Sequence, residues 1–455
     1  MNHQVIIIGG GLAGLVCAFY LKRANVDVKL FEASANTGGK IASQQVGGER
    51  FDVGPNTVLE SNESIARLID DLHLRERMIF ADAASNARFV LKHGAPVVMP
   101  ASPQTFLTTP LFSGLAKLRL LREPFIGISA REETLAEFCE RRFGREVLDY
   151  ALDPFLIGTY AARAGDLSAD ACLKLLRELE QAHGSVIKGF FKRAKENRGV
   201  KKNYSGKMFS FEHGFSEVMT SLRNELGQAV LTEAQVNTLE ATGQPANGVR
   251  VRYTHQGDTF EASASTVVIA AQADSAAYLI EGVDVKLAAT LRQIKSSPVA
   301  QVFLVYDRNE VASPQGFGLL VPSKEQQEIL GVVFNSRIFP ARYQQTVFTV
   351  FIGGSRQPEL ARQTDDDLKS LAGRGLAATL GITAQPIDAA VAKWPDAIPQ
   401  YGLGYNHILQ TVSDFESHTK NIFFTGNWRS GISVPDTIAH AHTVAEKILN
   451  ALIND

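Results

Sequence analysis

Three glycines and one acid near the start of the chain have the types and spacing to hold a dinucleotide. The apolar run 5–8 leads into Gly9, Gly11 and Gly14, and Glu32 ends the next apolar run. Gly9 permits a tight turn, Gly11 lets the backbone approach a pyrophosphate, and Gly14 lets a helix pack closely on a strand. The helix N-terminus would face the phosphates, and Glu32 would accept the ribose hydroxyls. The motif therefore predicts a bound dinucleotide and the redox chemistry that it supplies.

A second glycine pair indicates which dinucleotide is bound. Gly38-Gly39-Lys40 follows Glu32 closely and extends the same cofactor face, which favours FAD over NAD. The three cysteines, Cys17, Cys139 and Cys172, have neither close pairing nor metal-ligand spacing. The chain also has no GxSxG, HExxH or Cys/His cluster, so we expect no metal and no protein nucleophile. Redox chemistry must therefore come from the cofactor.

The elements that would position these residues are scattered along the chain. After the first strand, residues 12–22 read as a helix and 28–31 as a strand. Residues 249–262 alternate around Gly257-Asp258 as a hairpin does, and 267–271 form a short apolar run. Another apolar run, 421–427, ends in Gly426-Asn427, and Pro435 opens an amphipathic helix. The cofactor domain is therefore predicted to be discontinuous.

Length supports more than one domain, because 455 residues exceed the size at which a single core keeps growing. The predicted fold class is α/β and α+β: a discontinuous Rossmann-type FAD-binding domain, a substrate domain with a mixed sheet, and a helical insertion that could face a membrane. The predicted bounds are 1–84, 205–290 and 400–455 for the FAD-binding domain, 290–400 for the substrate domain and 85–205 for the helical insertion.

The balance of 46 basic and 48 acidic residues gives no reason to expect nucleic acid as a partner. The apolar start is interrupted by glycines and lacks a basic leader, so we expect a cytoplasmic protein. Residues 106–128 mix large apolar side chains with Lys117, Arg119 and Arg122, as either an interfacial helix or a cavity-lining helix would. Residues 188–207 hold eight Lys or Arg and one acid, as either a lipid-binding or a solvated segment would. A peripheral position on the inner face of the cell membrane stays open, and the sequence predicts no oligomeric state.

Nearly the whole chain resembles the FAD-containing porphyrinogen oxidases, the protoporphyrinogen oxidase type within the amine-oxidase-like flavoproteins. The cofactor blocks mark the superfamily, and the middle blocks mark the porphyrinogen oxidases. The blocks that carry the resemblance are Gly9–Gly14, Glu32, Gly38–Lys40, Phe51–Thr57, Ala87–Leu91, Pro154–Ala161, Gly316–Gly318, Trp394–Tyr401, Thr425–Trp428 and Gly431–Asp436.

The resemblance implies oxidation of protoporphyrinogen IX to protoporphyrin IX in heme biosynthesis. Six electrons would leave in three steps, each passing a hydride to the flavin, with oxygen as acceptor and hydrogen peroxide as product. The alternatives are oxidation of coproporphyrinogen III to coproporphyrin III, a flavin amine oxidase or desaturase, or a flavin-binding scaffold without activity. The substrate would be a small molecule, and whether the product passes to a ferrochelatase stays open.

The resemblance also implies which residues contact the cofactor. They come from the glycine motifs, from a segment beside the flavin ring, from a strand near the adenine and from the C-terminal loop. The predicted cofactor-binding residues are Gly9, Gly11, Leu12, Ala13, Gly14, Glu32, Ala33, Gly39, Lys40, Gly54, Pro55, Asn56, Thr57, Val236, Trp394, Gly426, Ile432, Ser433 and Val434. The final helix would point its N-terminus at the flavin and stabilise the reduced, anionic form.

Four residues are predicted to bind the substrate. A porphyrinogen is a large apolar macrocycle with carboxylate tails, so its site needs apolar walls and a cation. Arg88 aligns with the family's propionate-binding arginine, and Leu320, Ile338 and Phe351 come from its pocket segments. Coproporphyrinogen-using relatives tend to carry a basic residue between positions 56 and 66, and this chain has none there, so with Arg88 present the resemblance favours protoporphyrinogen.

Two positions depart from the family pattern. Ala162 stands where a glycine is usual, which leaves the shape of the backbone beside the flavin, and so the exact substrate, open. Asn427 replaces a common aspartate but keeps a side chain that can hydrogen-bond a ribityl hydroxyl. FAD binding is expected to survive the change at Asn427.

Overall fold

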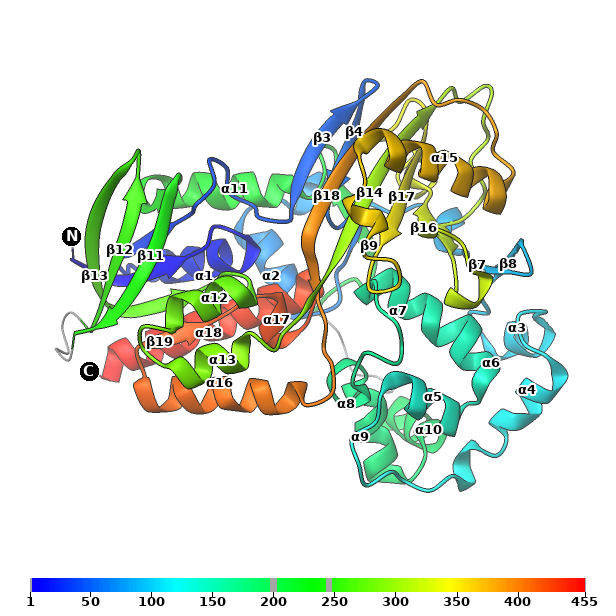
Figure 1. Ribbon diagram of the computed structural model, residues 1–455, viewed down its shortest axis with the longest axis horizontal. Helices are drawn as coiled ribbons and strands as arrows, with labels where there is room; N and C mark the ends of the chain where they lie inside the picture. Colours follow the sequence, from blue (N-terminus) through cyan, green and yellow to red (C-terminus); the bar gives the residue numbers. More distant parts are fainter. Residues whose placement is uncertain (1, 197–202, 243–247, 455) are drawn as a thin grey trace.

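A computed structural model describes residues 2–196, 203–242 and 248–454 of the chain. Two large sheets and one helical segment form its main parts (Figure 1). Both ends of the chain lie in the part built on the first sheet, the second sheet lies beside it, and the helices of the third part lie below the second sheet in this view.

The first sheet has seven strands from three separate stretches of sequence. Its order is β10, β2, β1, β13, β12 and β11, with β19 paired to β13. β12 pairs antiparallel with β11 and β13, and the other pairings are parallel. The strands are β1 (Asn2–Ile8), β2 (Val28–Phe31), β10 (Val230–Leu231), β11 (Ala234–Ala241), β12 (Val249–His255), β13 (Asp258–Ile269) and β19 (Ile422–Phe424).

Helices cover both faces of this sheet, which explains why residues 5–8 of β1 are all apolar and buried. On one face, α1 (Leu12–Arg23) packs against α11 (Ser216–Leu226) and α18 (Val434–Asn454). The opposite face meets α12 (Ala273–Ile280), α13 (Val285–Leu291) and α16 (Tyr405–Thr419). This layered arrangement places the turn between β1 and α1 at the carboxyl end of a central parallel strand, where such folds bind nucleotides.

The second sheet also has seven strands, and α15 (Asp365–Leu380) packs on one of its faces. Its order is β18, β14, β17, β16, β15, β7 and β8, and only the β15–β7 pairing is parallel. The strands are β7 (Arg88–Lys92), β8 (Ala95–Val98), β14 (Ser296–Tyr306), β15 (Gly318–Leu320), β16 (Ile329–Val333), β17 (Thr346–Gly353) and β18 (Asp388–Pro399).

Two small sheets lie between the large ones. β3 (Ala42–Val46) and β4 (Glu49–Val53) form a hairpin, while β5 (Val58–Leu59), β9 (Met208–Phe211) and β6 (Met78–Phe80) form a three-stranded sheet. Residues 54–57, predicted to border the flavin, join β4 to β5 and are therefore held at both ends.

The helical segment holds α3 to α10 and is pinned by a buried charge network. Arg142 is fully buried and contacts Glu123 and Glu180, which are also buried. Because a buried charge is costly without its partner, this network fixes how the helices pack. The helices are α3 (Pro103–Thr108), α4 (Gly114–Leu120), α5 (Leu135–Arg142), α6 (Arg145–Val147), α7 (Asp153–Tyr160), α8 (Ala169–Cys172), α9 (Lys174–His183) and α10 (Val186–Glu196), with a π-turn over Leu148–Leu152.

The predicted fold class is confirmed, while the division into domains stays a prediction. Strands β7 and β8 lie inside the segment 85–205, which was expected to be helical, because they pair with β15 and extend the second sheet. Residues 106–128 are not one helix but parts of α3, α4 and a 3₁₀ turn over Glu123–Phe125, since Pro110 and Pro124 interrupt the pattern. Of the basic segment 188–207, residues 197–202 lie outside the described chain. Among the described helices, none has the length and apolar character to cross a membrane.

Candidate active site

The turn between β1 and α1 forms an open cradle. Gly9 has φ +109°, and a Cβ on Gly14 would lie only 1.9 Å from the Gly9 carbonyl oxygen, so both positions require glycine. Above Gly11 there is space, because an added Cβ would meet only the Gly39 Cα, at 4.0 Å. Gly38 N–H donates to the Gly10 carbonyl at 2.8 Å, so the two predicted glycine segments lie side by side.

This cradle suits a pyrophosphate. Gly11 is the N-cap of α1 and provides no side-chain cap, so the first N–H groups of the helix remain available to an anion. Leu12 and Ala13 form the first turn of the helix, and their side chains are buried. The residues present therefore fit the FAD that the sequence predicts.

Glu32 is oriented by backbone groups at the end of β2. Its two carboxylate oxygens accept from Gly10 N–H at 2.6 Å and from Ser34 N–H at 2.8 Å. Each oxygen keeps a lone pair for a ribose hydroxyl. Beside it, Ala33 is exposed.

The start of β11 runs beside Glu32 and brings Val236 to the same end of the sheet. Ala234 N–H donates to the Glu32 carbonyl at 2.9 Å. Val236 pairs with Tyr253, whose ring lies 4.5 Å from that of Phe31. Val236 therefore stands where the prediction of an adenine contact needs it, although that contact stays a prediction.

The segment Gly54–Thr57 is locked between the two large sheets. Gly54 has φ +100°, and a Cβ there would lie 1.9 Å from the Lys40 carbonyl oxygen. Its N–H donates to the Gln301 Oε1 at 2.8 Å, and Gln301 Nε2 donates to the Gly54 carbonyl at 2.9 Å. Pro55 and Thr57 are half-buried, whereas Asn56 is buried and its amide donates to the Asp52 carbonyl at 3.4 Å.

Lys40 and Trp394 meet this locked segment from the neighbouring elements. Lys40 Nζ donates to the Ala397 carbonyl at 2.6 Å, and Trp394 Nε1 donates to Gln301 Oε1 at 3.4 Å. Burial lowers the pKa of Lys40 to about 8, against the opposing effect of Asp396. A positive Lys40 would favour phosphate or the anionic reduced flavin.

The C-terminal loop, residues 425–434, is fixed by a short helix and by a helix cap. Gly426 is buried with φ +142°, and the following residues form α17 (Asn427–Ser430). Ser433 caps the next helix, because its hydroxyl accepts from Asp436 N–H at 3.2 Å and donates to Asp436 Oδ2 at 2.6 Å. Ile432 and Val434 on either side are half-buried.

Arg429 follows Trp428 in this loop, a position from which it could tune the flavin ring or bind a propionate. The structure instead places its side chain in a buried ion pair with Glu416, at 3.0 Å, while Glu416 also accepts from Phe424 N–H at 2.9 Å. The guanidinium thus ties α17 to α16 behind the loop.

His440 supports the same loop from α18, and it makes stability depend on pH. Thr425 Oγ1 and His440 Nδ1 are hydrogen-bonded at 3.1 Å, and burial, with help from Arg429 and Lys447, lowers the His440 pKa to about 4. Between pH 6.5 and 4 the unfolded chain therefore binds a proton that the folded chain does not. The free energy of unfolding should fall as the pH falls through this window, by up to about 3 kcal/mol.

We expect His440→Gln to reduce this acid sensitivity, since glutamine keeps a hydrogen-bonding group near Thr425 but does not titrate. Urea unfolding at pH 7 and pH 4.5 measures the difference, and His407→Gln on the exposed side of α16 is the control. Equal pH dependence in the wild type and His440→Gln would contradict the assignment.

Register places three of the four predicted substrate residues on one face of the second sheet. Gln301 pairs with Phe351, Phe351 with Gly331, and Gly331 with Leu320. Leu320 pairs with Val90, and Arg88 lies two residues before Val90, so all of these positions share a face. Leu320 and Phe351 are half-buried, as residues lining an open space would be. Ile338 differs: it is 1% exposed on α14 (Asn335–Ile338) and packs in a core cluster.

Helix α7 covers part of this face. Ile157 and Ala161 pack with Phe351 and Trp394, and a Cβ on Gly158 would lie 3.0 Å from Leu320 Cδ2. Ala161, next to the unusual Ala162, has φ +48° and its carbonyl accepts from Ser355 N–H at 2.7 Å. Ala162 itself is buried in the core of the first sheet.

Arg88 stands at the edge of this face as an exposed cation. Its guanidinium lies 5.1 Å from the centre of the Phe317 ring and 3.7 Å from Met208 Sδ. Within the described residues, no acid pairs with it; its one oxygen contact is the Asn86 carbonyl at 3.4 Å. It is therefore available to a carboxylate.

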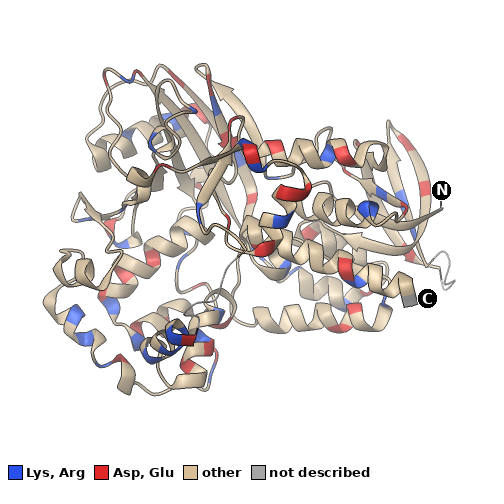
Figure 2. Cartoon of the chain, turned by 180° about the vertical axis from the view of Figure 1, so that it is seen from behind, with Lys and Arg blue, Asp and Glu red and all other residues tan. Residues whose placement is uncertain are grey.

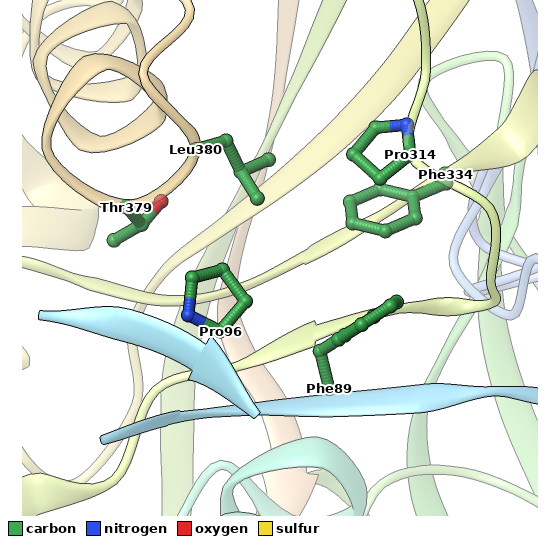
Figure 3. A pocket seen from close by; sticks show the side chains of 6 residues that line it. All are labelled: Phe89, Pro96, Pro314, Phe334, Thr379 and Leu380. Carbon is green, nitrogen blue, oxygen red and sulfur yellow. The ribbon is translucent and has the colours of Figure 1, made fainter. Parts of the chain in front are cut away.

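An apolar pocket lies on the opposite face of the same sheet (Figure 3). Phe89 follows Arg88 and so points the other way, towards α15. The single side-chain hydroxyl in the lining, that of Thr379, donates to the Gly375 carbonyl at 2.7 Å. This pocket offers no reactive group. Its lining residues are Phe89, Pro96, Pro314, Phe334, Thr379 and Leu380.

Several residues at the site were missed from the sequence. Gln301 is the only polar residue in the run 299–305, and this was a readable signal of a specific partner. Tyr401 and Tyr405 donate hydroxyl hydrogen bonds to the Asn427 and Trp428 carbonyls, and nothing in their spacing predicted it. Among the described residues, no cluster of His, Cys, Asp and Glu could hold a metal ion.

Comparison with known proteins gives one family match, two relatives and one solved structure. Residues 12–449 match the family described as flavin containing amine oxidoreductase. The chain is 30% identical to protoporphyrinogen oxidase 2, chloroplastic/mitochondrial, of Arabidopsis thaliana, over 99% of this chain and 94% of the relative. It is 25% identical to coproporphyrinogen III oxidase of Staphylococcus aureus, over 99% and 100%. A crystal structure of a protein from Exiguobacterium sp. 255-15 superposes with a TM-score of 0.82 at 21% identity, covering 98% of both chains.

Proposed function

The chain belongs to the flavin-containing amine oxidoreductase family and is an FAD-dependent oxidoreductase, and from this premise we propose that it oxidises protoporphyrinogen IX to protoporphyrin IX. Bound FAD supplies a two-electron oxidation, and three rounds would remove the six electrons that separate porphyrinogen from porphyrin. Oxygen is proposed to take these electrons and to leave as hydrogen peroxide. Support comes from relatives along the full length of the chain that are named for porphyrinogen oxidation.

The observation that carries the proposal is Arg88, a cation with no acidic partner among the described residues, at the edge of an apolar sheet face. Leu320 and Phe351 are half-buried apolar residues of this face, and Arg88 at its edge can bind a carboxylate through two parallel hydrogen bonds. The macrocycle of a porphyrinogen matches this arrangement. Coproporphyrinogen III carries four carboxylates instead of two, so one cation favours the less charged substrate.

Purified, FAD-loaded protein tests the proposal directly. Porphyrin fluorescence is followed in air with protoporphyrinogen IX or coproporphyrinogen III, against heat-killed protein as the control for autoxidation, and peroxide is measured alongside. Faster protoporphyrin formation, with three peroxides per porphyrin, supports the proposal. A preference for coproporphyrinogen would keep the reaction and overturn the substrate, and oxidation of an amine alone would overturn both.

We also propose that the helical segment contacts an anionic membrane surface. Around α4 several large apolar side chains are exposed, with Leu115 at 81% and Phe125 at 86%, and Lys117 and Arg119 stand between them. The basic residues of this region are visible at the lower left of Figure 2. Such a mixture favours anionic lipid.

Co-sedimentation with vesicles checks this contact. The protein should pellet with phosphatidylglycerol vesicles and less with phosphatidylcholine vesicles, and Phe125→Asp should lower the bound fraction several-fold. Ile387→Asp removes another exposed apolar residue, at 59%, from the second sheet region and should leave binding unchanged. Equal loss in both variants, or no pelleting of the wild type at low salt, would remove the lipid contact.

A further inference from the structure

The buried side chain of Gln301 hydrogen-bonds both backbone groups of a single residue, Gly54. Gln301 is 2% exposed, and its amide both accepts from Gly54 N–H and donates to the Gly54 carbonyl, at 2.8 and 2.9 Å. A side-chain amide here replaces the paired bonds of a neighbouring strand. Both backbone groups of one residue in the segment 54–57 are thus satisfied from β14.

The surroundings leave little freedom for this contact. Trp394 Nε1 donates to the same Gln301 oxygen at 3.4 Å, which defines the orientation of the amide. Gly54 cannot shift towards Lys40, whose carbonyl already fills the place of a Cβ. The contact therefore joins β4, β14 and β18 at one point.

The same glutamine stands on the substrate-facing side of the second sheet. It pairs with Phe351 across β14 and β17, so its side chain leaves the sheet on the face that carries Phe351, Leu320 and Arg88. One amide thus connects the segment predicted to border the flavin ring with the face proposed to bind the substrate.

We infer that Gln301 is a positioning residue that sets the placement of the segment Gly54–Thr57, and through it of the flavin, relative to the substrate face. The inference rests on the proposed function only for the identity of the substrate. The chemistry of the amide is what matters: one donor and one acceptor, uncharged, at a fixed spacing.

Gln301→Glu tests this requirement because its two protonation states differ in their ability to donate a hydrogen bond and in charge. The neutral carboxyl can both donate to and accept from Gly54, whereas the carboxylate can only accept and places a charge in a buried site. Charged groups on the adjoining elements are Lys40, Asp396 and the buried pair of Asp52 with Arg342. Gln301→Leu removes both bonds at every pH.

FAD affinity and the flavin absorption spectrum are measured from pH 5.5 to 8.5 without any porphyrinogen. At pH 8.5, Gln301→Glu should bind FAD about tenfold more weakly than the wild type, with a shifted spectrum, and should recover both as the pH falls. Gln301→Leu should be weak at all pH values. Thr349→Val is the control. Thr349 lies in the same sheet, on β17, and its buried hydroxyl donates to Asn335 and does not contact Gly54.

Two outcomes would overturn the inference. One is wild-type affinity and spectrum in Gln301→Glu at pH 8.5. The other is an equal, pH-independent loss in all three variants, which would reduce the role of Gln301 to general stability. These measurements contain no porphyrinogen and do not depend on turnover. A wild type that fails to oxidise porphyrinogens in a separate assay would therefore count against the proposed reaction alone.

Discussion

Replacing Gly54 by alanine is expected to abolish FAD binding while the protein still folds. Two effects act together at this residue: φ is +100°, and the new Cβ would lie 1.9 Å from the Lys40 carbonyl oxygen. The clash is with backbone rather than with a flexible side chain, so the segment itself must move. Movement would break both bonds to Gln301 and separate the segment from the glycine pair at Gly38-Gly39. We expect at least a hundredfold loss of affinity, measured by flavin fluorescence on titrating apoprotein with FAD.

The hairpin between β3 and β4 supplies a matched control. Gly48 also has a positive φ, of +79°, but a Cβ there would meet nothing within 4 Å. Gly48→Ala therefore carries the cost of the backbone conformation, about 1 kcal/mol, without the clash. If both variants lose FAD equally, strain in the hairpin is the cause and the tight contact at Gly54 is irrelevant. If neither does, this segment does not border the cofactor.

The parts of the site that could be predicted from the sequence are those built by neighbouring residues. Gly9, Gly14 and Glu32 act within one strand-turn-helix unit, where each residue type follows from local backbone requirements. The capping box of Thr134 and Glu137 likewise forms between residues three apart, and the spacing of a threonine and a glutamate is its sequence signature. Local chemistry needs no knowledge of which strands pair.

The parts that the sequence could not give depend on pairing between distant segments. Arg88 faces Leu320 and Phe351 only because β7 joins β15 in parallel, more than two hundred residues along the chain. A shift of one residue in that pairing would turn Arg88 towards α15 and Phe89 towards the site. Ile338 was carried over with the others, yet it lies on a short helix off the sheet, and its burial at 1% suits packing. The apolar type of the side chain could not distinguish the residues on the sheet face from the core residue Ile338.

Pairing over long distances also explains why two polar residues escaped notice. Gln301 stands out as a polar residue in an apolar run, and Asp52 lies between two apolar residues, but neither pattern identifies the partner of the side chain. Their partners, Gly54 and Arg342, come from other strands and loops. Each joins the first part of the chain to the second sheet, so the cofactor segment and the substrate face share their supports. We expect substitutions at these supports to change cofactor binding and substrate binding together.

Arg88 is the residue at which an effect on substrate binding can be separated from an effect on cofactor binding. Its guanidinium touches the Phe317 ring, the Met208 sulfur and the Asn86 carbonyl but none of the segments that cradle the cofactor. Arg88→Ala should therefore raise KM for protoporphyrinogen IX about 10- to 100-fold, the worth of a charged hydrogen-bonding pair, with flavin content unchanged. Because the carboxylate lies away from the reacting carbons, kcat should change little.

Arg88→Lys and a modified substrate sharpen the test. Lysine keeps the charge but loses the two-pronged contact, so its KM should fall between those of the wild type and Arg88→Ala. With the dimethyl ester of the porphyrinogen, which has no carboxylate, wild type and Arg88→Ala should show the same KM. Arg67→Ala, which removes another arginine stacked on an aromatic ring, at 5.5 Å from Tyr20, should leave KM unchanged. An Arg88→Ala variant that keeps the wild-type KM for the free acid would move the carboxylate contact to another residue and leave the apolar face as the sole basis of recognition.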